Sequence, residues 1–188
     1  MIFDRWFPLI IGRSQCPFIT EIQGPYKKLI KNLKRHQDPI HKDDRFKKLT
    51  TWINKEVNVF ARAHKFPDKY EAKESWFISY NKGDMQPFHS HPGYTISTLF
   101  FLEGHEDDVS LVFKNPLIDM KNPLHQTPND STKAQYYNEF TYMSCGYRPK
   151  SGVFLLWRSY NEHSVGVKVN NKKRIVFVYN CDPKNEVE

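Results

Sequence analysis

The spacing of apolar residues changes near residue 74, and this change limits what the chain can fold into. Before it, apolar residues recur every three or four positions in 26–33 and 46–60, as in helices with one buried face. After it, apolar residues form short runs typical of strands. These runs are 76–80, 95–102, 109–113, 137–143, 153–157, 164–169 and 174–180. Helices followed by many short strands predict a mainly β fold of the α+β type, with helices packed on one face of a β-sandwich.

Turn and cap residues predict where some elements begin. Gly24-Pro25 is expected to open the first helix, because proline suits the first helical turn. Asp43 or Asp44 is the expected N-cap of the second helix. Residues 7–11 are typical of a short strand. Residues 114–137 are rich in Pro, Asn, Asp and Thr, which predicts a long loop of the kind that often closes over a site.

The length of 188 residues favours one domain, with a helical part at 1–73 and a β core at 74–182. The net charge of +7 is unevenly placed: residues 1–73 hold 16 Lys/Arg and 8 Asp/Glu, a net of +8, and the remainder is at −1. Two interpretations stay open. The basic helices bind an anionic partner such as nucleic acid, or their lysines form solvated helix surfaces.

The composition also bears on the environment of the chain. No apolar run approaches the roughly 18 residues that a membrane span needs. The three cysteines form no C-x-x-C pair, and the odd count argues against a disulfide framework. A reducing cytoplasm is therefore the expected location.

Three histidines form the strongest chemical pattern. His89 and His91 are separated by one residue, so at the end of a strand both rings can point to the same side and chelate a metal. An H-x-H pair is equally compatible with a turn, but His163 follows the strand 153–157 and offers a third ligand. Three ligands on one face leave positions open on a non-haem Fe(II) centre, where 2-oxoglutarate takes two and dioxygen one. Arg174, eleven positions after His163, suits the far C5 carboxylate of 2-oxoglutarate.

Several segments, in this order and spacing, resemble the 2-oxoglutarate/Fe(II) oxygenases found in marine bacteria and their phages. The matching pieces are Trp76-x-x-x-Tyr80-x-x-Gly83, His89-x-His91-Pro92, Leu111-Val112-Phe113-x-x-Pro116, Pro149-x-x-Gly152, His163-x-Val165 and Arg174 through Asn180. The resemblance implies a single oxygenase domain folded as a double-stranded β-helix (jelly-roll), with the metal at one mouth of the barrel. It also implies Fe(II) and 2-oxoglutarate as cofactors, and hydroxylation of a substrate with succinate and CO2 as co-products.

The chain departs from the wider superfamily at two positions. The second residue of the first motif is an acid there and His91 here, so a three-histidine site lacks the charge of a carboxylate. The residue two after the arginine is often Ser and is Val176 here, which removes one hydrogen bond to the C5 carboxylate. Tyr80 and Thr98 are candidate helpers in binding the cosubstrate. No catalytic residue beyond the metal ligands is predicted.

Two other functions compete with this interpretation. One is a cupin-type dioxygenase with three histidines, although Thr95 and Ile96 stand where a cupin glutamate is expected. The other is a non-catalytic binding module on the same barrel. Fold and cofactor do not specify a substrate. If the chain is phage-encoded, the expected location is the cytoplasm of the bacterial host.

Overall fold

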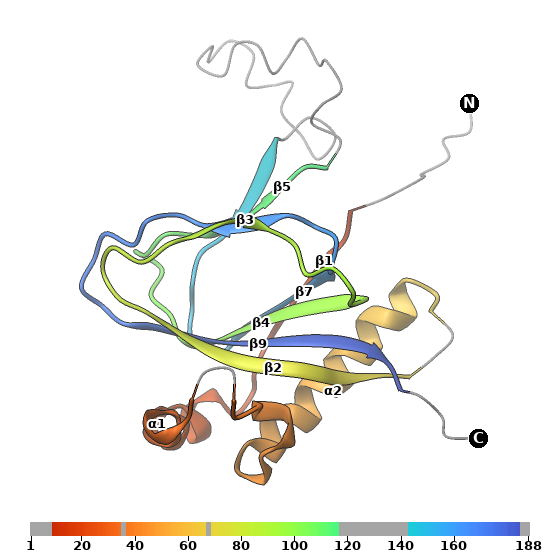
Figure 1. Cartoon of the computed structure of the whole chain (residues 1–188), viewed down its shortest axis with the longest axis horizontal. Helices are drawn as coiled ribbons and strands as arrows, with labels where there is room; N and C mark the ends of the chain where they lie inside the picture. The colour runs from red at the N-terminus through yellow and green to blue at the C-terminus, as the bar shows by residue number, and fades with distance from the viewer. Residues whose placement is uncertain (1–8, 35–36, 67–68, 117–142, 185–188) are drawn as a thin grey trace.

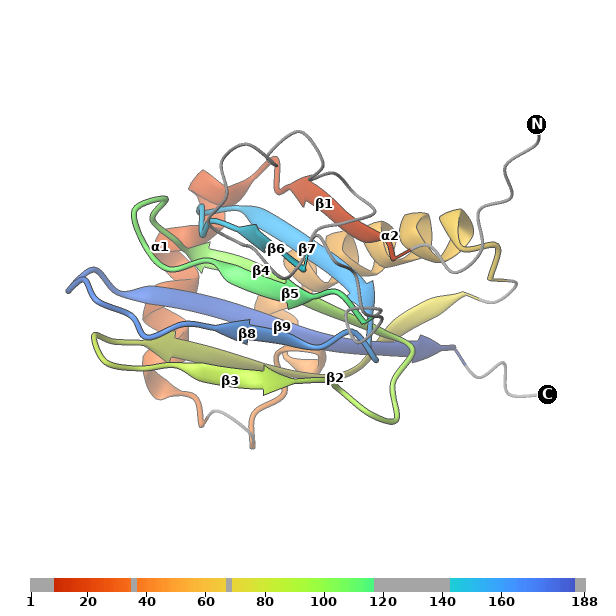
Figure 2. The ribbon, with the colours of Figure 1, turned by 90° about the horizontal axis from the view of Figure 1, so that it is seen from above.

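Two antiparallel β-sheets stack face to face in the computed structural model, which describes residues 9–34, 37–66, 69–116 and 143–184. The five-stranded sheet has the order β1 (Ile11–Gln15), β7 (Val153–Arg158), β4 (Ile96–Glu103), β9 (Arg174–Pro183) and β2 (Tyr70–Tyr80). The four-stranded sheet has the order β3 (Gln86–His89), β8 (His163–Val165), β5 (Leu111–Lys114) and β6 (Ser144–Tyr147). Figure 1 shows the sheets as two layers, and in Figure 2 β8 lies over β9 and β3 over β2.

The helices α1 (Ile19–Leu29) and α2 (Lys47–Ala63) cover the outer face of the five-stranded sheet (Figure 1). Short 3-10 turns at Ile30–Asn32, Ile40–Lys42 and Asp44–Phe46 connect them. The outer core lies between these helices and the sheet, where Phe46 is fully buried and packs edge-on against Phe177 at 5.7 Å between ring centroids. The apolar faces of the helices and of the five-stranded sheet thus bury each other from water.

A second core lies between the two sheets, and the two-residue period of the strands separates it from the first. On β9, Phe177 and Tyr179 face the helices, whereas Val176 and Val178 face the other sheet. Arg174 and Asn180 have the same parity as the two valines and therefore share the inner face. A strand residue can therefore reach the space between the sheets only if it occupies an inward-facing position of this two-residue period.

The predicted fold class is confirmed: the chain is a mainly β jelly-roll with two helices packed on one sheet. The predicted strands 95–102, 153–157 and 174–180 lie at β4, β7 and β9. The expected boundary between residues 73 and 74 falls inside β2. Within the described residues, no helix is long and apolar enough to cross a membrane.

Several boundaries were wrong. Pro25 lies inside α1 instead of opening it, because Ile22 and Tyr26 share a buried face and the helix begins six residues earlier, at Ile19. The first strand is Ile11–Gln15, which starts where the expected one ends. β6 starts at Ser144, after the expected strand 137–143, of which 137–142 lie outside the described residues. β3 was not predicted as a strand. Most of the expected loop 114–137 also lies outside the described residues.

Candidate metal centre

Three histidines converge at one end of the four-stranded sheet. His89 ends β3 and His163 begins β8, and the antiparallel pairing of these strands places the two residues opposite each other. His91 follows β3, where its backbone N–H donates to the carbonyl of Ser159 at 2.9 Å. One ligand nitrogen from each of the three rings lies within 4.8 Å of the others. The structure therefore brings together all three residues that the sequence pattern singled out.

Hydrogen bonds orient two of the rings for metal binding. The Nδ1 atom of His89 lies 2.9 Å from the carbonyl oxygen of Pro87, and that of His163 lies 3.0 Å from the carbonyl oxygen of Asn161. A carbonyl only accepts hydrogen bonds, so each Nδ1 carries the proton and each Nε2 keeps its lone pair. This is the tautomer of a histidine that binds a metal through Nε2.

The third ring is oriented by a side chain from a distant part of the sequence. The Nδ1 atom of His91 lies 2.7 Å from Oδ1 of Asn180 on β9. The same oxygen accepts a hydrogen bond of 2.8 Å from the hydroxyl of Ser97, and the amide nitrogen of Asn180 donates to Glu74 at 2.9 Å. Asn180 was not predicted as a functional residue, because a lone asparagine in a strand carries no motif that distinguishes it from a core residue.

Burial favours the neutral form of two of the rings, those of His91 and His163. Desolvation lowers the pKa of His163 to about 3, and burial also lowers the pKa of His91. Neutral imidazoles can bind a divalent cation near neutral pH without first losing a proton. The donor set, three imidazole nitrogens with free lone pairs, suits a first-row transition metal.

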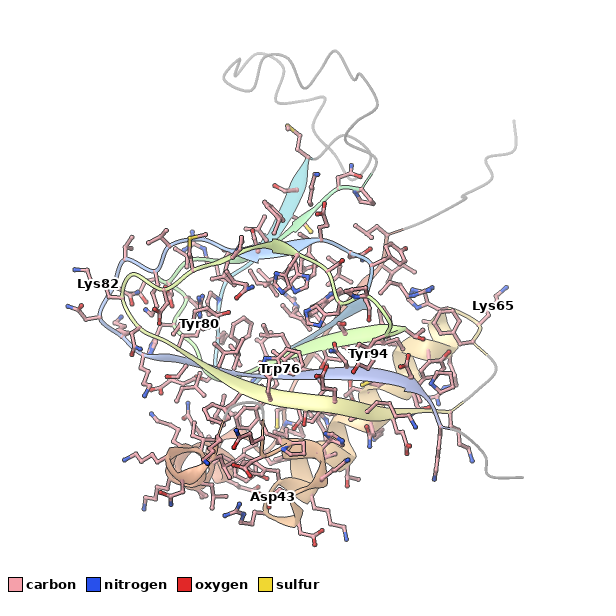
Figure 3. The ribbon with its side chains drawn as sticks, in the orientation of Figure 1. Asp43, Lys65, Trp76, Tyr80, Lys82 and Tyr94 are labelled. Atoms are coloured by element: carbon pink, nitrogen blue, oxygen red, sulfur yellow. The ribbon has the colours of Figure 1, made fainter. Side chains whose placement is uncertain are left out.

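A cavity of about 340 Å³ extends from the histidines between the two sheets. Figure 3 shows Trp76 and Tyr80 reaching from β2 into this space. Its walls are mostly apolar and include Ile78, Leu99, Leu111, Val165 and Val178. Such walls exclude water and leave the polar contacts to the two ends of the cavity.

Arg174 lies near the other end of the cavity and is 1% exposed. Its guanidinium stacks on the ring of Tyr80 at 4.4 Å, and Tyr80 lines the cavity although Arg174 itself does not. Nη1 donates to the carbonyl of Val109 at 2.8 Å and lies 3.7 Å from Asp108, whose carboxylate also pairs with buried Lys168 at 3.2 Å. Two buried cations thus share one carboxylate, so the cluster of Arg174, Lys168 and Asp108 carries a net positive charge.

The opposite edge of the same guanidinium is available for a ligand. Among the residues that the structure describes, neither Nε nor Nη2 of Arg174 has a hydrogen-bond partner, although both are buried. These two N–H groups are the parallel donors that bind a carboxylate in a bidentate way. Buried donors without a partner are costly, so their presence points to a ligand that completes them.

The predicted helpers differ in position. Tyr80 lines the cavity and contacts Arg174, as a cosubstrate helper would. Thr98 instead shares the face of β4 that packs against the helices, and its hydroxyl donates to the carbonyl of Tyr179 at 3.2 Å. The structure does not bring Thr98 to the cavity, and Ser97, one residue earlier, has the inward parity.

A jelly-roll with three converging imidazoles at one end, and an arginine edge without a partner among the described residues at the other, has the arrangement expected of a non-haem metal oxygenase. Residues 74–180, more than half of the chain, match the model of the family described as "Putative 2OG-Fe(II) oxygenase". The chain belongs to this family of 2-oxoglutarate-dependent iron oxygenases, and Fe(II) and 2-oxoglutarate are the cofactors of the family. The marine and phage affiliation stays a prediction.

Solved structures share the fold at low sequence identity. HygX from Streptomyces hygroscopicus, with nickel, 2-oxoglutarate and hygromycin B bound, is 12% identical over 94% of this chain and 84% of that chain, with a TM-score of 0.65. A prolyl-4-hydroxylase from Pseudomonas putida is 10% identical over 93% and 88%, with a TM-score of 0.60. An oxidoreductase of the 2OG-Fe(II) oxygenase family from Burkholderia pseudomallei is 12% identical over 93% and 85%, with a TM-score of 0.63. A search of curated proteins gave no significant match.

Proposed function

We propose that His89, His91 and His163 hold the Fe(II) of this oxygenase through their Nε2 atoms, and that Arg174 binds the C5 carboxylate of 2-oxoglutarate. The observation that carries this proposal is the convergence of three imidazoles with their ligand atoms within 4.8 Å. The reaction is proposed to be hydroxylation of a substrate C–H bond, with a substrate not yet identified.

The residues of the chain position the reactants and exclude water. The Nε and Nη2 edge of Arg174 would fix one end of the keto acid, and the apolar walls between the sheets would keep water from its chain. When bound, Fe(II) and 2-oxoglutarate supply the oxidising power, with dioxygen consumed and succinate and CO2 released. Tyr80 is proposed to hold the guanidinium in place through its ring.

The histidine at position 91 changes the charge of the centre. Three neutral imidazoles leave both positive charges of the metal uncompensated, whereas a carboxylate ligand would cancel one of them. The dianionic cosubstrate then meets positive charge at both ends, at the metal and at the Arg174 and Lys168 cluster. This electrostatic match supports a keto acid as the second ligand and disfavours the cupin-type alternative, which has no use for a buried cation.

Metal and cosubstrate binding test the proposal directly. Anaerobically purified protein is expected to bind one Fe(II) per chain and then 2-oxoglutarate, and to form succinate slowly when dioxygen is admitted without a substrate. Succinate formation and metal binding should both be lost in His163→Ala. Metal binding without any binding of 2-oxoglutarate would favour the cupin-type dioxygenase, and binding of neither would leave a non-catalytic module.

A nucleic-acid partner at the basic helices is a separate proposal, supported by a groove of about 510 Å³ between α1 and the five-stranded sheet. Lys28, Lys31 and Lys173 line it, and no ion pair of these lysines is found within the described part of the chain. Single-stranded DNA should bind with an affinity that falls steeply with salt concentration. Lys28→Glu combined with Lys31→Glu should abolish this binding, and Lys55→Glu, at an exposed position of α2, should not. Equal loss in both variants would refute a role for the groove.

We infer a reducing cytoplasm, which is supported by three free thiols, with Cys16 and Cys181 buried and Cys145 exposed. Alkylation of Cys145 in intact cells, without prior reduction, would test it. A Cys145 thiol that reacts only after reduction would contradict it.

A further inference from the structure

A continuous chain of hydrogen bonds runs from the surface to the third histidine of the metal centre. It begins at the exposed carboxylate of Glu74, passes through the amide of Asn180 at 2.9 Å, and ends on Nδ1 of His91 at 2.7 Å. Asn180 is 2% exposed, so its amide has little access to bulk water as an alternative partner. The two strands that carry Glu74 and Asn180 pair directly, with these residues opposite each other.

This series of hydrogen bonds has a fixed donor and acceptor order, because the carboxylate of Glu74 can only accept a hydrogen bond. A carboxylate accepts hydrogen bonds, so the amide nitrogen of Asn180 must face Glu74 and the amide oxygen must face His91. Ser97, opposite Asn180 on β4, donates its hydroxyl to the same oxygen at 2.8 Å and is itself 2.8 Å from the hydroxyl of Ser159. An oxygen facing His91 requires the proton on Nδ1, and Nε2 is then left with its lone pair.

The other two histidines do not depend on such a chain. The Nδ1 atoms of His89 and His163 each hydrogen-bond to the backbone carbonyl oxygen of the residue two positions earlier. A backbone carbonyl cannot exchange its acceptor for a donor. An asparagine amide can rotate by 180° and exchange its acceptor for a donor. Of the three metal-binding histidines, His91 is therefore the one whose tautomer and orientation depend on other side chains.

We propose that Glu74, acting through Asn180, is a positioning residue that fixes the metal-binding tautomer of His91 and passes part of its negative charge to that ligand. The proposal rests on the metal site described above. A hydrogen bond from Nδ1–H to an oxygen polarised by a carboxylate raises the donor strength of Nε2. Glu74 does not bind the metal itself. It thus restores some of the negative charge that the site lacks because residue 91 is a histidine and not an acid.

The tautomer of His91 tests the proposal without metal, cosubstrate or turnover. In metal-free, folded protein, nitrogen-15 NMR should show the proton on Nδ1 for all three histidines. Glu74→Gln should populate the other tautomer of His91, because a glutamine can also donate and lets the Asn180 amide rotate. His89 and His163 should not change. A His91 that carries its proton on Nε2 in the wild type, or that stays unchanged in Glu74→Gln, would overturn the proposal.

Metal affinity gives the second measurement, made by Co(II) titration. Asn180→Leu should weaken binding about 10- to 100-fold, the usual range for a lost outer-sphere partner, and Glu74→Gln up to about tenfold. Combining Glu74→Gln with Asn180→Asp places a carboxylate directly on Nδ1 and should restore affinity and the Nδ1–H tautomer. Glu71→Gln removes the same charge three residues earlier on β2 and should leave both unchanged.

These results separate the inference from the proposed oxygenase function. If the protein fails to bind 2-oxoglutarate but the tautomer and Co(II) affinity respond as stated, the positioning role stands and the function does not. If Glu71→Gln and Glu74→Gln weaken Co(II) binding equally, general surface charge explains the effect and the positioning role is refuted.

Discussion

Replacing Arg174 should separate cosubstrate binding from metal binding. Arg174 lies toward the end of the cavity away from the three histidines, and its Nε and Nη2 have no hydrogen-bond partner among the described residues. In Arg174→Ala these two charge-assisted hydrogen bonds to the C5 carboxylate are lost. Truncating one partner of a buried charge pair costs about 2–5 kcal/mol. At about 1.4 kcal/mol per tenfold change, the dissociation constant of 2-oxoglutarate should rise about 30- to 4000-fold.

Calorimetric titration of 2-oxoglutarate into Mn(II)-loaded protein measures this change, and a separate Mn(II) titration checks the metal site. Lys172→Ala is a matched control, because it removes a positive charge two residues away that is exposed and paired with Asp107 at 2.7 Å. Arg174→Lys keeps the charge without the parallel donors and should recover part of the affinity. A folded Arg174→Ala protein whose 2-oxoglutarate affinity stays within threefold of wild type would refute the assignment.

Further predictions concern stability and the metal. Because burial holds the folded-state pKa of His163 at about 3, the unfolded chain binds up to one more proton at this residue than the metal-free fold does between about pH 3 and pH 6.5. Stability of the metal-free protein should therefore fall as the pH drops from 6.5, by about 2 kcal/mol at pH 5, and His163→Leu should reduce this slope in urea titrations. Saturating Zn(II) should raise the melting temperature of the wild type but not of His163→Ala. Gly152→Ala should cost about 1–3 kcal/mol, because Gly152 has φ of +84° and a Cβ would collide with the side chain of Gln15; an unchanged urea midpoint would contradict this.

The period of apolar residues predicted the fold because burial dominates it. The buried stripe of α2 and the alternation on β9 are both visible in the sequence. Local signals failed where tertiary packing outweighed them. Pro25 suggested a helix start, but Ile22 and Tyr26 gain more from burial against the sheet than the helix loses at one missing backbone donor. β3 contains a proline and only four residues, which gives too short a pattern to separate a strand from a turn.

The candidate site was predictable as far as its residue types were distinctive. Histidines at strand ends indicate a metal, and an arginine at the expected distance indicates a carboxylate. Thr98 and Ser97 show the limit, because a difference of one residue decides which face of β4 a side chain occupies, and only the register reveals it. Asn180 shows another limit: its role follows from the residues it meets in space, and they lie 89 and 106 positions away in the chain.

Strand β9 fixes the distance between the two ends of the cavity. β9 is hydrogen-bonded to β4 on one side and to β2 on the other. These hydrogen bonds keep the strand extended and fix its register. Asn180 beside the metal ligands and Arg174 at the far end lie on one face, separated by about 20 Å of extended backbone. Inserting one residue between them would turn one of the two to the opposite face. A keto acid spans only part of this distance, and the Arg174 side chain covers the rest, with its guanidinium held by Tyr80 and by the carbonyl of Val109. The site should therefore discriminate keto acids by chain length, because the held guanidinium cannot follow a shorter or longer one.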